Sequence, residues 1–443
     1  MIKEGLKLLQ KKRFSEALII FDKIIKSNHE DSDALFCLGN IYYELNDLTK
    51  SLNFYEKSLK KYTDSEVILN NYAIVLQSMG KIKEAKEIFL KLIKLNPNNV
   101  KAYYRLFRMN NNNFNKNYLN TLKSLEKNKN LSLSDKSLIN FIFSKAEKNK
   151  NKIQNEIHFL NKAHEFHFNN KIKHNLKITK YYKNILVNKF NKISFFEENN
   201  KNNFVNDNSP VFIIGLPRSG STLVESLLMQ SNKKYYSYGE SGIFDKSIFE
   251  QIENNILKNF DLDNLEIKIN EEFLFKSTQN LYFYTGGKNF IDKSLENFFY
   301  IDVILKLYPK AKFIHTFRNR FDSAIAIYQS MLIHLPWAHS INNILGYILS
   351  YEKVINFYKK KYPDKILDIE LEKFTSKPKI YSKKIYNFCS LNWDDNNLNF
   401  HNNENLTSKT SSFLQVRNKI EKSIINKYQS YYYLLEKEKI NFN

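Results

Sequence analysis

The feature of this sequence that most restricts its fold is a spacing of 34 residues across the first hundred positions. Four columns keep that spacing in phase, and each column holds residues of one kind. The columns are Gly5, Gly39 and Ala73; Phe14, Leu48 and Ile82; Ala17, Ser51 and Ala85; and Phe21, Tyr55 and Phe89. Small residues allow two helices to approach closely, and aromatic residues fill the space between neighbouring units. The spacing therefore predicts stacked helix pairs.

Turn signals fall in the same phase, at "KKR", "LND" and "MGK". The pattern resembles the tetratricopeptide repeat, whose unit is a helix–turn–helix of about 34 residues. We therefore expect residues 1–112 to form an all-α tetratricopeptide solenoid. Such arrays are curved and generally bind peptides or proteins in their groove. A rigid spacer or a homodimerisation surface is an equally weighted alternative.

Residues 113–200 are rich in Asn and Lys, but "LINFIFSKAEKN" and "IHFLNKAHEF" keep helical apolar spacing. We interpret this segment as degenerate repeat helices followed by a linker, which is best placed at the polar stretch 197–210. His164 and His167 are three residues apart and could share a helix face, as metal ligands do. No Cys or carboxylate cluster joins them, so a solvated helix face is the favoured interpretation.

The net charge of +22 raises the question of a nucleic-acid partner. Only seven of the 68 basic residues are arginine, and Lys and Asn fill surface positions throughout, so the charge is better explained by composition bias than by a basic patch. Two distant cysteines predict no disulfide framework. No stretch reaches the 18 apolar residues of a membrane span, and the N-terminus lacks a signal-peptide core. We expect a cytoplasmic protein.

The chemistry is concentrated after residue 209. "VFIIGLPRSGST" (211–222) predicts a buried strand, a phosphate-binding loop and the start of a helix. The loop has the two glycines of G-x-x-x-x-G-K-[ST], but Ser221 replaces the lysine that would reach the outer phosphates of a triphosphate. Arg218 supplies positive charge from inside the loop. The loop therefore suits a 5′-phosphate carrying at most one further group, which argues against a nucleotide kinase.

The residues from about 209 to 434 resemble the sulfotransferases, and most closely the tyrosylprotein sulfotransferases and their bacterial relatives with tetratricopeptide repeats. Besides the loop, five stretches match in order: "YGES" (238–241), "FIDKSLENF" (290–298), "YPKAKFIHTFRNRFDSAIAIYQS" (308–330), "FCSLNWDDNNLNFHNN" (388–403) and "TSSFLQVRNKIEKSIINKYQSY" (410–431). The resemblance implies that residues 209–443 form a P-loop-like α/β domain with a central parallel sheet flanked by helices.

The resemblance also implies a cofactor and roles for individual residues. The cofactor is 3′-phosphoadenosine 5′-phosphosulfate (PAPS), and no metal is required. Glu240 matches the general base, and Lys293 matches the cation beside the leaving oxygen, with Arg218 assisting. The implied cofactor-binding residues are Arg218, Ser219, Gly220, Ser221 and Thr222 on the 5′ side, Arg318 at the 3′-phosphate, and Ser412 and Lys427. Asp292 is expected to be structural.

The chain departs from the family pattern near the 3′-phosphate. Asn319 and Arg320 replace the usual Asp-Pro, and Ala326 replaces a serine that touches this phosphate in the family. Ser323, one helical turn earlier, and Arg320 are the candidates to compensate. These departures bear on cofactor affinity more than on the type of reaction.

Arginine use supports the motif assignments independently. Beyond residue 200 the chain has only Arg218, Arg318, Arg320 and Arg417, and all four lie inside these motifs. Arginine forms planar bidentate pairs that lysine cannot imitate. For Arg417, binding a carboxylate within the fold and binding a ligand are equally weighted. His315 is expected to be a core or strand-end histidine.

The sequence thus predicts PAPS-dependent sulfuryl transfer to a hydroxyl acceptor, with protein tyrosine as the first choice, suggested by family closeness alone. A polypeptide acceptor could be held by the repeat groove. A carbohydrate or small-molecule acceptor is the alternative within the same chemistry. A non-catalytic tetratricopeptide scaffold with a degenerate cofactor site is the alternative of a different class.

Overall fold

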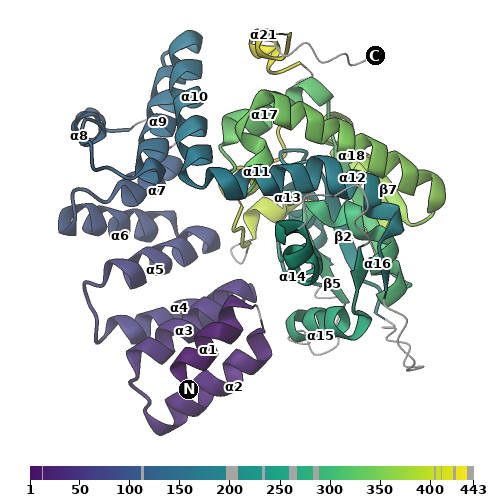
Figure 1. The fold of residues 1–443 in the computed structure, drawn as a ribbon, viewed down its shortest axis with the longest axis horizontal. Helices are drawn as coiled ribbons and strands as arrows, with labels where there is room; N and C mark the ends of the chain where they lie inside the picture. The colour runs from purple at the N-terminus through teal and green to yellow at the C-terminus, as the bar shows by residue number, and fades with distance from the viewer. Residues whose placement is uncertain are drawn as a thin grey trace.

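The computed structural model describes ten stretches of the chain: residues 1–11, 13–110, 114–195, 208–231, 235–258, 267–282, 289–403, 406–410, 412–422 and 426–436. Most of the predicted linker at 197–210 lies outside the described residues. A helical solenoid curves along one side of the molecule and an α/β domain fills the other side (Figure 1).

The solenoid begins with three helix pairs and a further helix. Their bounds are α1 Ile2–Gln10, α2 Phe14–Ser27, α3 Ser32–Glu44, α4 Leu48–Leu59, α5 Glu66–Met79, α6 Ile82–Leu95 and α7 Val100–Met109. The structure explains the small-residue columns, because a Cβ on Gly5 would lie 2.7 Å from the Phe21 ring and one on Gly39 would lie 2.5 Å from the Tyr55 ring. The predicted helix pairs are confirmed.

The next helices join the solenoid to the α/β domain. They are α8 Lys116–Glu126, α9 Leu133–Lys148, α10 Ile153–Asn170, α11 Ile172–Lys180, the π-helical turn η1 Tyr181–Ile185, α12 Leu186–Lys189 and the 3-10 turn η2 Phe190–Lys192. Helices α9 and α10 pack together, and α11 crosses to the α/β domain (Figure 1). The hydroxyl of Tyr182 donates to Asp245 at 2.5 Å, and Lys183 donates to Asn343 at 2.9 Å. These helices therefore pack against both parts of the chain.

His164 corrects the expectation of a solvated helix face. Its side chain is only 1% exposed, because α10 packs here against the α/β domain. Its Nε2 lies 2.9 Å from the carbonyl oxygen of Tyr328, and its Nδ1 lies 2.9 Å from Nδ1 of His339. Among the described residues, no group of three or more histidine, cysteine or acidic side chains is placed to hold a metal ion.

The α/β domain is built on five parallel strands in the order β3 (Tyr235–Ser237), β5 (Asn289–Asp292), β2 (Val211–Gly215), β6 (Lys312–Phe317) and β7 (Ile366–Glu370). A separate parallel pair joins β1 (Ser194–Phe195) and β4 (Lys268–Ile269). Both faces of the sheet are covered, since Val211 and Ile213 belong to one buried cluster while Phe212 and Ile214 belong to another. The predicted fold class is confirmed.

Helices cover this sheet on both faces. The helices of the domain are α13 Ser221–Leu228, α14 Ile243–Lys258, α15 Glu271–Tyr282, α16 Ile301–Leu307, α17 Arg320–Ser330, α18 Ile341–Lys361, α19 Leu371–Ser376, α20 Pro378–Phe388 and α21 Tyr433–Glu436, with short 3-10 turns between some of them. The short α21 packs on α18 rather than on the sheet. Within the stretches that the structure describes, no helix has the length and apolar character needed to cross a membrane.

The solenoid and the α/β domain share hydrogen bonds as well as a core. Asn46 donates to the carbonyl oxygen of Ser237 at 2.8 Å, and the Tyr236 hydroxyl donates to that of Leu45 at 2.6 Å. The backbone N–H of Ser408 donates to the carbonyl oxygen of Ser78 at 2.9 Å. One buried cluster continues from the repeats into the domain. The ends of α3 and α5 therefore contact the α/β domain, the former at β3.

Candidate active site

The loop after β2 has the backbone of a phosphate-binding loop. Gly215 leaves the strand against β6, where a Cβ would lie 2.1 Å from the carbonyl oxygen of Thr316. Gly220 has φ of 93° and caps the N-terminus of α13. The Oγ of Ser219 lies 2.7 Å from both the Leu216 carbonyl oxygen and Thr316 Oγ1. The Ser219 hydroxyl therefore fixes the loop.

Ser221 and Thr222 form the first turn of α13 and are nearly buried. Their backbone N–H groups have no partner within the helix, because the first turn lacks preceding carbonyls. The same helix end carries a partial positive charge that favours anions. Arg218 has φ of 68°, and its Nη1 donates to Ser412 Oγ at 2.7 Å. The loop and Ser412 are thus brought together.

Glu240 and Lys293 meet at the ends of β3 and β5. The Nζ of Lys293 lies 2.6 Å from Oε1 of Glu240 and 3.8 Å from Oε2 of Glu225. The backbone N–H of Lys293 donates to the carbonyl oxygen of Gly239 at 2.8 Å, which ties the two motifs together. The Lys293 side chain is buried, whereas 46% of the Glu240 side chain is exposed. The carboxylate therefore faces outward from a fixed ammonium group.

Electrostatics keep both members of this pair charged. Burial alone would raise the pKa of Glu240, but the charge and hydrogen bond of Lys293 outweigh it and hold the pKa below the ordinary value. Burial would lower the pKa of Lys293, but Glu240 and Glu225 raise it. Burial raises the pKa of Glu225, although Lys293 opposes that shift. Glu240 is thus ionised at neutral pH and can accept a proton.

Asp292 precedes Lys293 and has a structural role, as expected. Its carboxylate accepts hydrogen bonds from four donors at the turn after β5. These donors are the hydroxyls of Ser241 and Tyr282, the backbone N–H of Ser294 and the side-chain amide of Asn297. Because Ser241 follows Glu240, Asp292 connects the two motifs that supply the ion pair.

Arg318 lies at the end of β6 and is nearly buried. It donates to Glu372 at 3.2 Å and to Asp322 at 3.3 Å. Asp322 also accepts from the backbone N–H of Lys427 at 3.2 Å and from that of Tyr428 at 3.1 Å. Arg318 and Lys427 are therefore brought together by one carboxylate on α17.

The two residues proposed to compensate for Ala326 lie in different environments. Arg320 forms a bidentate pair with Glu352, with distances of 2.9 and 2.7 Å. Ser323 is completely buried, and within the described part of the chain its Oγ has no hydrogen-bond partner. Ser323 thus has an unused donor, whereas Arg320 is already paired with a carboxylate.

Two further predicted positions are structural. Arg417 donates to the carbonyl oxygens of Ser78 at 3.1 Å and Leu406 at 2.8 Å, so it fastens the C-terminal segment to the repeats. It pairs with carbonyls, whereas the sequence favoured a carboxylate or a ligand. His315 is buried in β6, as expected, with its Nδ1 2.7 Å from Asp368.

Two charged residues beside the Glu240–Lys293 pair were not predicted from the sequence. Glu225 lies one helix turn after Ser221 on α13 and faces Lys293. Lys409 lies between two late motifs and interacts electrostatically with Glu240, and its Nζ donates to the Tyr43 carbonyl oxygen at 2.9 Å. The helical spacing of Glu225 from the loop was a usable signal, whereas one lysine among many gave none for Lys409.

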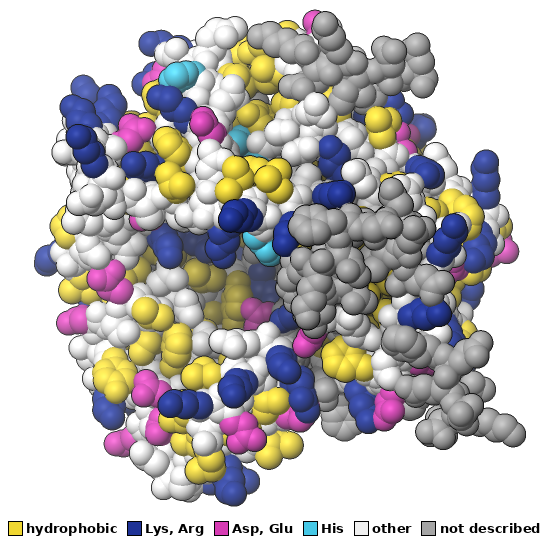
Figure 2. Space-filling view, viewed as in Figure 1, with side chains coloured by type: hydrophobic (Ala, Val, Ile, Leu, Met, Phe, Trp, Pro, Cys, Tyr) yellow, Lys and Arg dark blue, Asp and Glu magenta, His cyan; other side chains and the backbone are white. Residues whose placement is uncertain are grey.

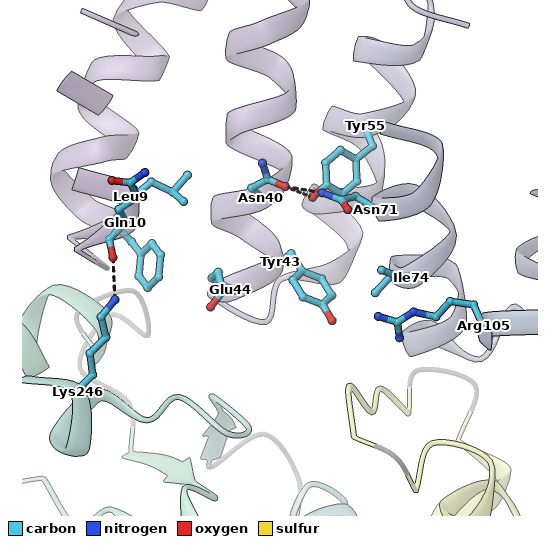
Figure 3. A pocket seen from close by; sticks show the side chains of 11 residues that line it. Leu9, Gln10, Asn40, Tyr43, Glu44, Tyr55, Asn71, Ile74, Arg105 and Lys246 are labelled. Carbon is cyan, nitrogen blue, oxygen red and sulfur yellow. Dashed lines mark hydrogen bonds between the residues drawn. The ribbon is translucent and has the colours of Figure 1, made fainter. Parts of the chain in front are cut away.

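The space between the repeats and the α/β domain is hollowed. Figure 2 shows a recess at the centre of this face, with Lys and Arg side chains along its rim. A cavity of about 440 Å³ lies within the concave side of the repeats, and Figure 3 shows Asn40, Tyr43 and Arg105 pointing toward it from the solenoid, with Lys246 on the opposite side. The Nζ of Lys409 lies 4.8 Å from the centre of the Tyr43 ring, which joins this cavity to the surroundings of Glu240.

Comparison with known proteins assigns both parts of the chain. Residues 210–395 match the model of the sulfotransferase family, and residues 33–99 match that of YpiA-like C-terminal tetratricopeptide repeats. The chain therefore contains a sulfotransferase-family domain preceded by tetratricopeptide-like repeats. A specific relation to tyrosylprotein sulfotransferases is not part of these matches.

Individual relatives are distant. An uncharacterized protein of Aquifex aeolicus (strain VF5) is 24% identical over 422 residues, covering 91% of this chain and 54% of that protein. The uncharacterized protein ycf37 of Pyropia yezoensis is 32% identical over 105 residues, covering 21% of this chain and 58% of that protein. The chain thus spans little more than half the length of these curated relatives.

Among solved structures, the sulfotransferase domain from the Synechococcus PCC 7002 olefin synthase is similar. It is 20% identical with a TM-score of 0.38, covering 56% of this chain and all of that domain.

Proposed function

We propose that the protein transfers a sulfuryl group from PAPS to a hydroxyl acceptor. The observation that carries this proposal is the 2.6 Å pair of Lys293 and Glu240 at the strand ends, beside a phosphate-binding loop that lacks the kinase lysine. A buried ammonium group next to an exposed, ionised carboxylate provides both charges that sulfuryl transfer requires. The carboxylate removes a proton from the acceptor, and the ammonium group stabilises the negative charge that develops on the leaving oxygen.

The residues present fit PAPS. The loop Ser219–Thr222 and the start of α13 offer N–H donors to a 5′-phosphosulfate, and Arg218 adds a guanidinium group there. Arg318 offers a second guanidinium group for the 3′-phosphate, and the orphaned hydroxyl of Ser323 is an unused donor on the neighbouring helix. Ser412 and Lys427 come from the C-terminal segment that closes over both. PAPS, when bound, supplies the activated sulfuryl group.

The protein's own groups then perform the proton and charge chemistry. Glu240 accepts the proton of the acceptor hydroxyl. General-base catalysis of this kind raises the rate by roughly 10²–10⁴. Lys293 retains donors beyond the one given to Glu240, because an ammonium group has three. One of these stabilises the oxygen on which negative charge develops. Glu225 and Asp292 hold Lys293 and its backbone in place.

The acceptor class is a further proposal. The cavity on the concave side of the repeats contacts the surroundings of Glu240 through Tyr43 and Lys409, so a chain lying in it would present a hydroxyl to the carboxylate. This favours a polypeptide acceptor, with tyrosine as the first candidate. A carbohydrate acceptor would use the same carboxylate without needing the groove.

Incubation with radiolabelled PAPS and a cell extract tests the activity and identifies the acceptor. We expect label in one or a few macromolecules, with none when Glu240 is replaced by Gln. Binding of 3′,5′-bisphosphoadenosine in a thermal-shift assay separates an enzyme from a scaffold. A protein that neither binds this nucleotide nor transfers label would overturn the proposal in favour of a non-catalytic scaffold.

A further inference from the structure

One face of α17 is bracketed by positive groups from two different parts of the chain. Asp322, Ala326 and Gln329 lie on this face, because they are four and three residues apart on a helix. Arg318 donates to Asp322, while Lys145 of α9 donates to the carbonyl oxygen of Gln329 at 2.6 Å. Ala326, where the sulfotransferases carry a phosphate-binding serine, therefore lies between a cation of the domain and a cation of the preceding helices.

The ring of Tyr428 connects these two sides. The guanidinium carbon of Arg318 lies 5.8 Å from the ring centre, and Nζ of Lys148 lies 6.0 Å from it. Lys148 also donates to the side chain of Gln329 at 2.6 Å and lies 3.6 Å from Glu156. Lys148 is thus already paired with a carboxylate, whereas Lys145 contacts a carbonyl oxygen and an aromatic ring.

A series of cation and aromatic contacts leads from Lys145 to the phosphate-binding loop. Lys145 Nζ lies 5.0 Å from the Phe141 ring, which packs edge-on against Tyr104. Arg108 of α7 lies 5.7 Å from both the Tyr104 ring and the Phe413 ring. Phe413 follows Ser412, which accepts the hydrogen bond of Arg218. Lys145 and Arg108 therefore both lie close enough to Arg218 to interact with it electrostatically.

Positive charge exceeds negative charge among the groups connected by these contacts. The cations are Arg108, Lys145, Lys148, Arg218, Arg318 and Lys427, and the carboxylates that contact them are Glu156, Asp322 and Glu372. Arg108 makes no hydrogen bond or ion pair with the described residues. Like charges held together at a partly buried site are costly unless an anion joins them. A ligand with two separated phosphate groups supplies that charge.

We propose that Lys145 and Arg108, which lie in helices outside the sulfotransferase-family match, bind the phosphates of the cofactor together with Arg218 and Arg318. Lys145 takes the place of the serine that is missing at Ala326. The helical half of the chain is then part of the cofactor site rather than a spacer. This inference rests on the proposed use of PAPS.

Burial supports a role in anion binding. Together with the charges of Lys148 and Arg218, and against that of Glu156, it lowers the pKa of the Lys145 ammonium to about 7. The groups facing Lys145 are thus Lys148 on its own helix, Glu156 on α10, Arg218 on the loop, and the Gln329 carbonyl oxygen on α17. A phosphate bound beside Lys145 would raise the pKa of its ammonium group and so restore the proton. Binding above pH 7 is therefore expected to take up a proton and to weaken as the pH rises toward 9.

The test is isothermal titration of the full chain with 3′,5′-bisphosphoadenosine. At pH 7, Lys145→Met removes the charge at similar length and is expected to weaken binding at least tenfold, because charge-assisted contacts to phosphate are strong. Arg108→Gln is expected to weaken it several-fold. Lys123→Met, at an exposed lysine of α8, is the matched control and should bind within twofold of the wild type.

Titrations at pH 8 in buffers with different ionisation enthalpies measure proton uptake. The wild type is expected to take up close to one proton, and Lys145→Met none. If Lys145→Met fails to fold, Arg108→Gln and the wild-type uptake decide the matter. Wild-type binding with both variants within twofold and no uptake would overturn this inference while leaving the proposed function intact. Absence of wild-type binding would instead overturn both.

Discussion

The two ends of the candidate cofactor site are constructed differently. The reacting end lies at the ends of adjacent strands, where Glu240 pairs directly with Lys293 and where Asp292, the last residue of β5, bonds to Ser241 and Ser294 beside them. The phosphate end gathers Arg318 from the sheet and Lys427 from the C-terminal segment on one helix, beside cations of the preceding helices. Side chains fixed at adjacent strand ends have little freedom to be replaced. A phosphate site assembled from distant segments tolerates the loss of one member, such as the serine that Ala326 replaces.

The largest effect is expected at the reacting end. Glu240→Gln should lower kcat at least a hundredfold while leaving binding of 3′,5′-bisphosphoadenosine within twofold, because the amide cannot accept the acceptor proton. Single-turnover assays with labelled PAPS and titration calorimetry measure the two quantities. Glu87→Gln, at an exposed glutamate of α6 outside the cavity, is a matched control. Unchanged turnover would remove Glu240 from the mechanism.

Two buried aspartates, Asp292 at the reacting end and Asp322 at the phosphate end, allow the two ends to be tested separately. Asp292→Asn and Asp322→Asn should each lower the free energy of unfolding by about 1.5–3 kcal/mol, since each carboxylate accepts several hydrogen bonds. Asp292→Asn should also lower turnover at saturating cofactor, whereas Asp322→Asn should chiefly raise the KM for PAPS. Urea unfolding and steady-state kinetics measure these effects, with the exposed Asp364→Asn as control. The reverse pattern would contradict the division into two ends.

The pH dependence of turnover probes the ion pair. Lys293 depresses the pKa of Glu240, so the carboxylate stays charged above the ordinary glutamate value of about 4.3 and loses its charge only as the pH falls through the lower, folded-state pKa. Turnover with saturating substrates should therefore be level from pH 7 down to pH 5. In Lys293→Met, burial acts unopposed by that charge, and the acid limb of the residual activity should move to higher pH. An unmoved limb would show that Lys293 does not set the charge of Glu240.

The smallest effect concerns the missing serine. Ala326→Ser should tighten binding of 3′,5′-bisphosphoadenosine by about 0.5–1.5 kcal/mol if the hydroxyl reaches the phosphate. The gain should be larger in the Lys145→Met background, because the serine then replaces a lost donor. Titration calorimetry of the four combinations forms a double-mutant cycle. Equal gains in both backgrounds would show that Lys145 and position 326 act independently.

The sequence predicted those parts of the molecule whose local residue spacing is itself a consequence of the secondary structure. Spaced small and aromatic residues led to the helix pairs, and the run from Val211 led to the strand, loop and helix. The meeting of Lys293 with Glu240 followed from the family motifs. The contacts between the solenoid and the domain were not predicted, because a surface of Asn and Lys looks the same whether it is solvated or buried.

His164 shows this limit most clearly. It continues the apolar face of α10 that Ile157 and Leu160 form, but the spacing does not indicate what covers that face. In the structure Tyr328 and His339 cover it. The predicted boundaries at 1–112, 113–200 and 209–443 follow composition, yet the buried core continues across them. Lys145 likewise carries no sequence signal, because its role depends on which helix lies opposite. Such contacts are decided by tertiary packing rather than by local periodicity.

The turn around Ser78 has a consequence for engineering and for evolution. Its carbonyl accepts from both Ser408 and Arg417, and Gly80 lies so close to Arg417 that a Cβ there would be 2.4 Å from Nε. The segment that carries Ser412 is thus hydrogen-bonded to, and packed against, the turn of one particular repeat. Exchanging the array for another of the same length would remove these contacts and displace Ser412 from its position beside the phosphate-binding loop. Repeats and domain are therefore expected to be inherited as a pair, and a chimera aimed at a new acceptor must retain the Ser78–Gly80 turn.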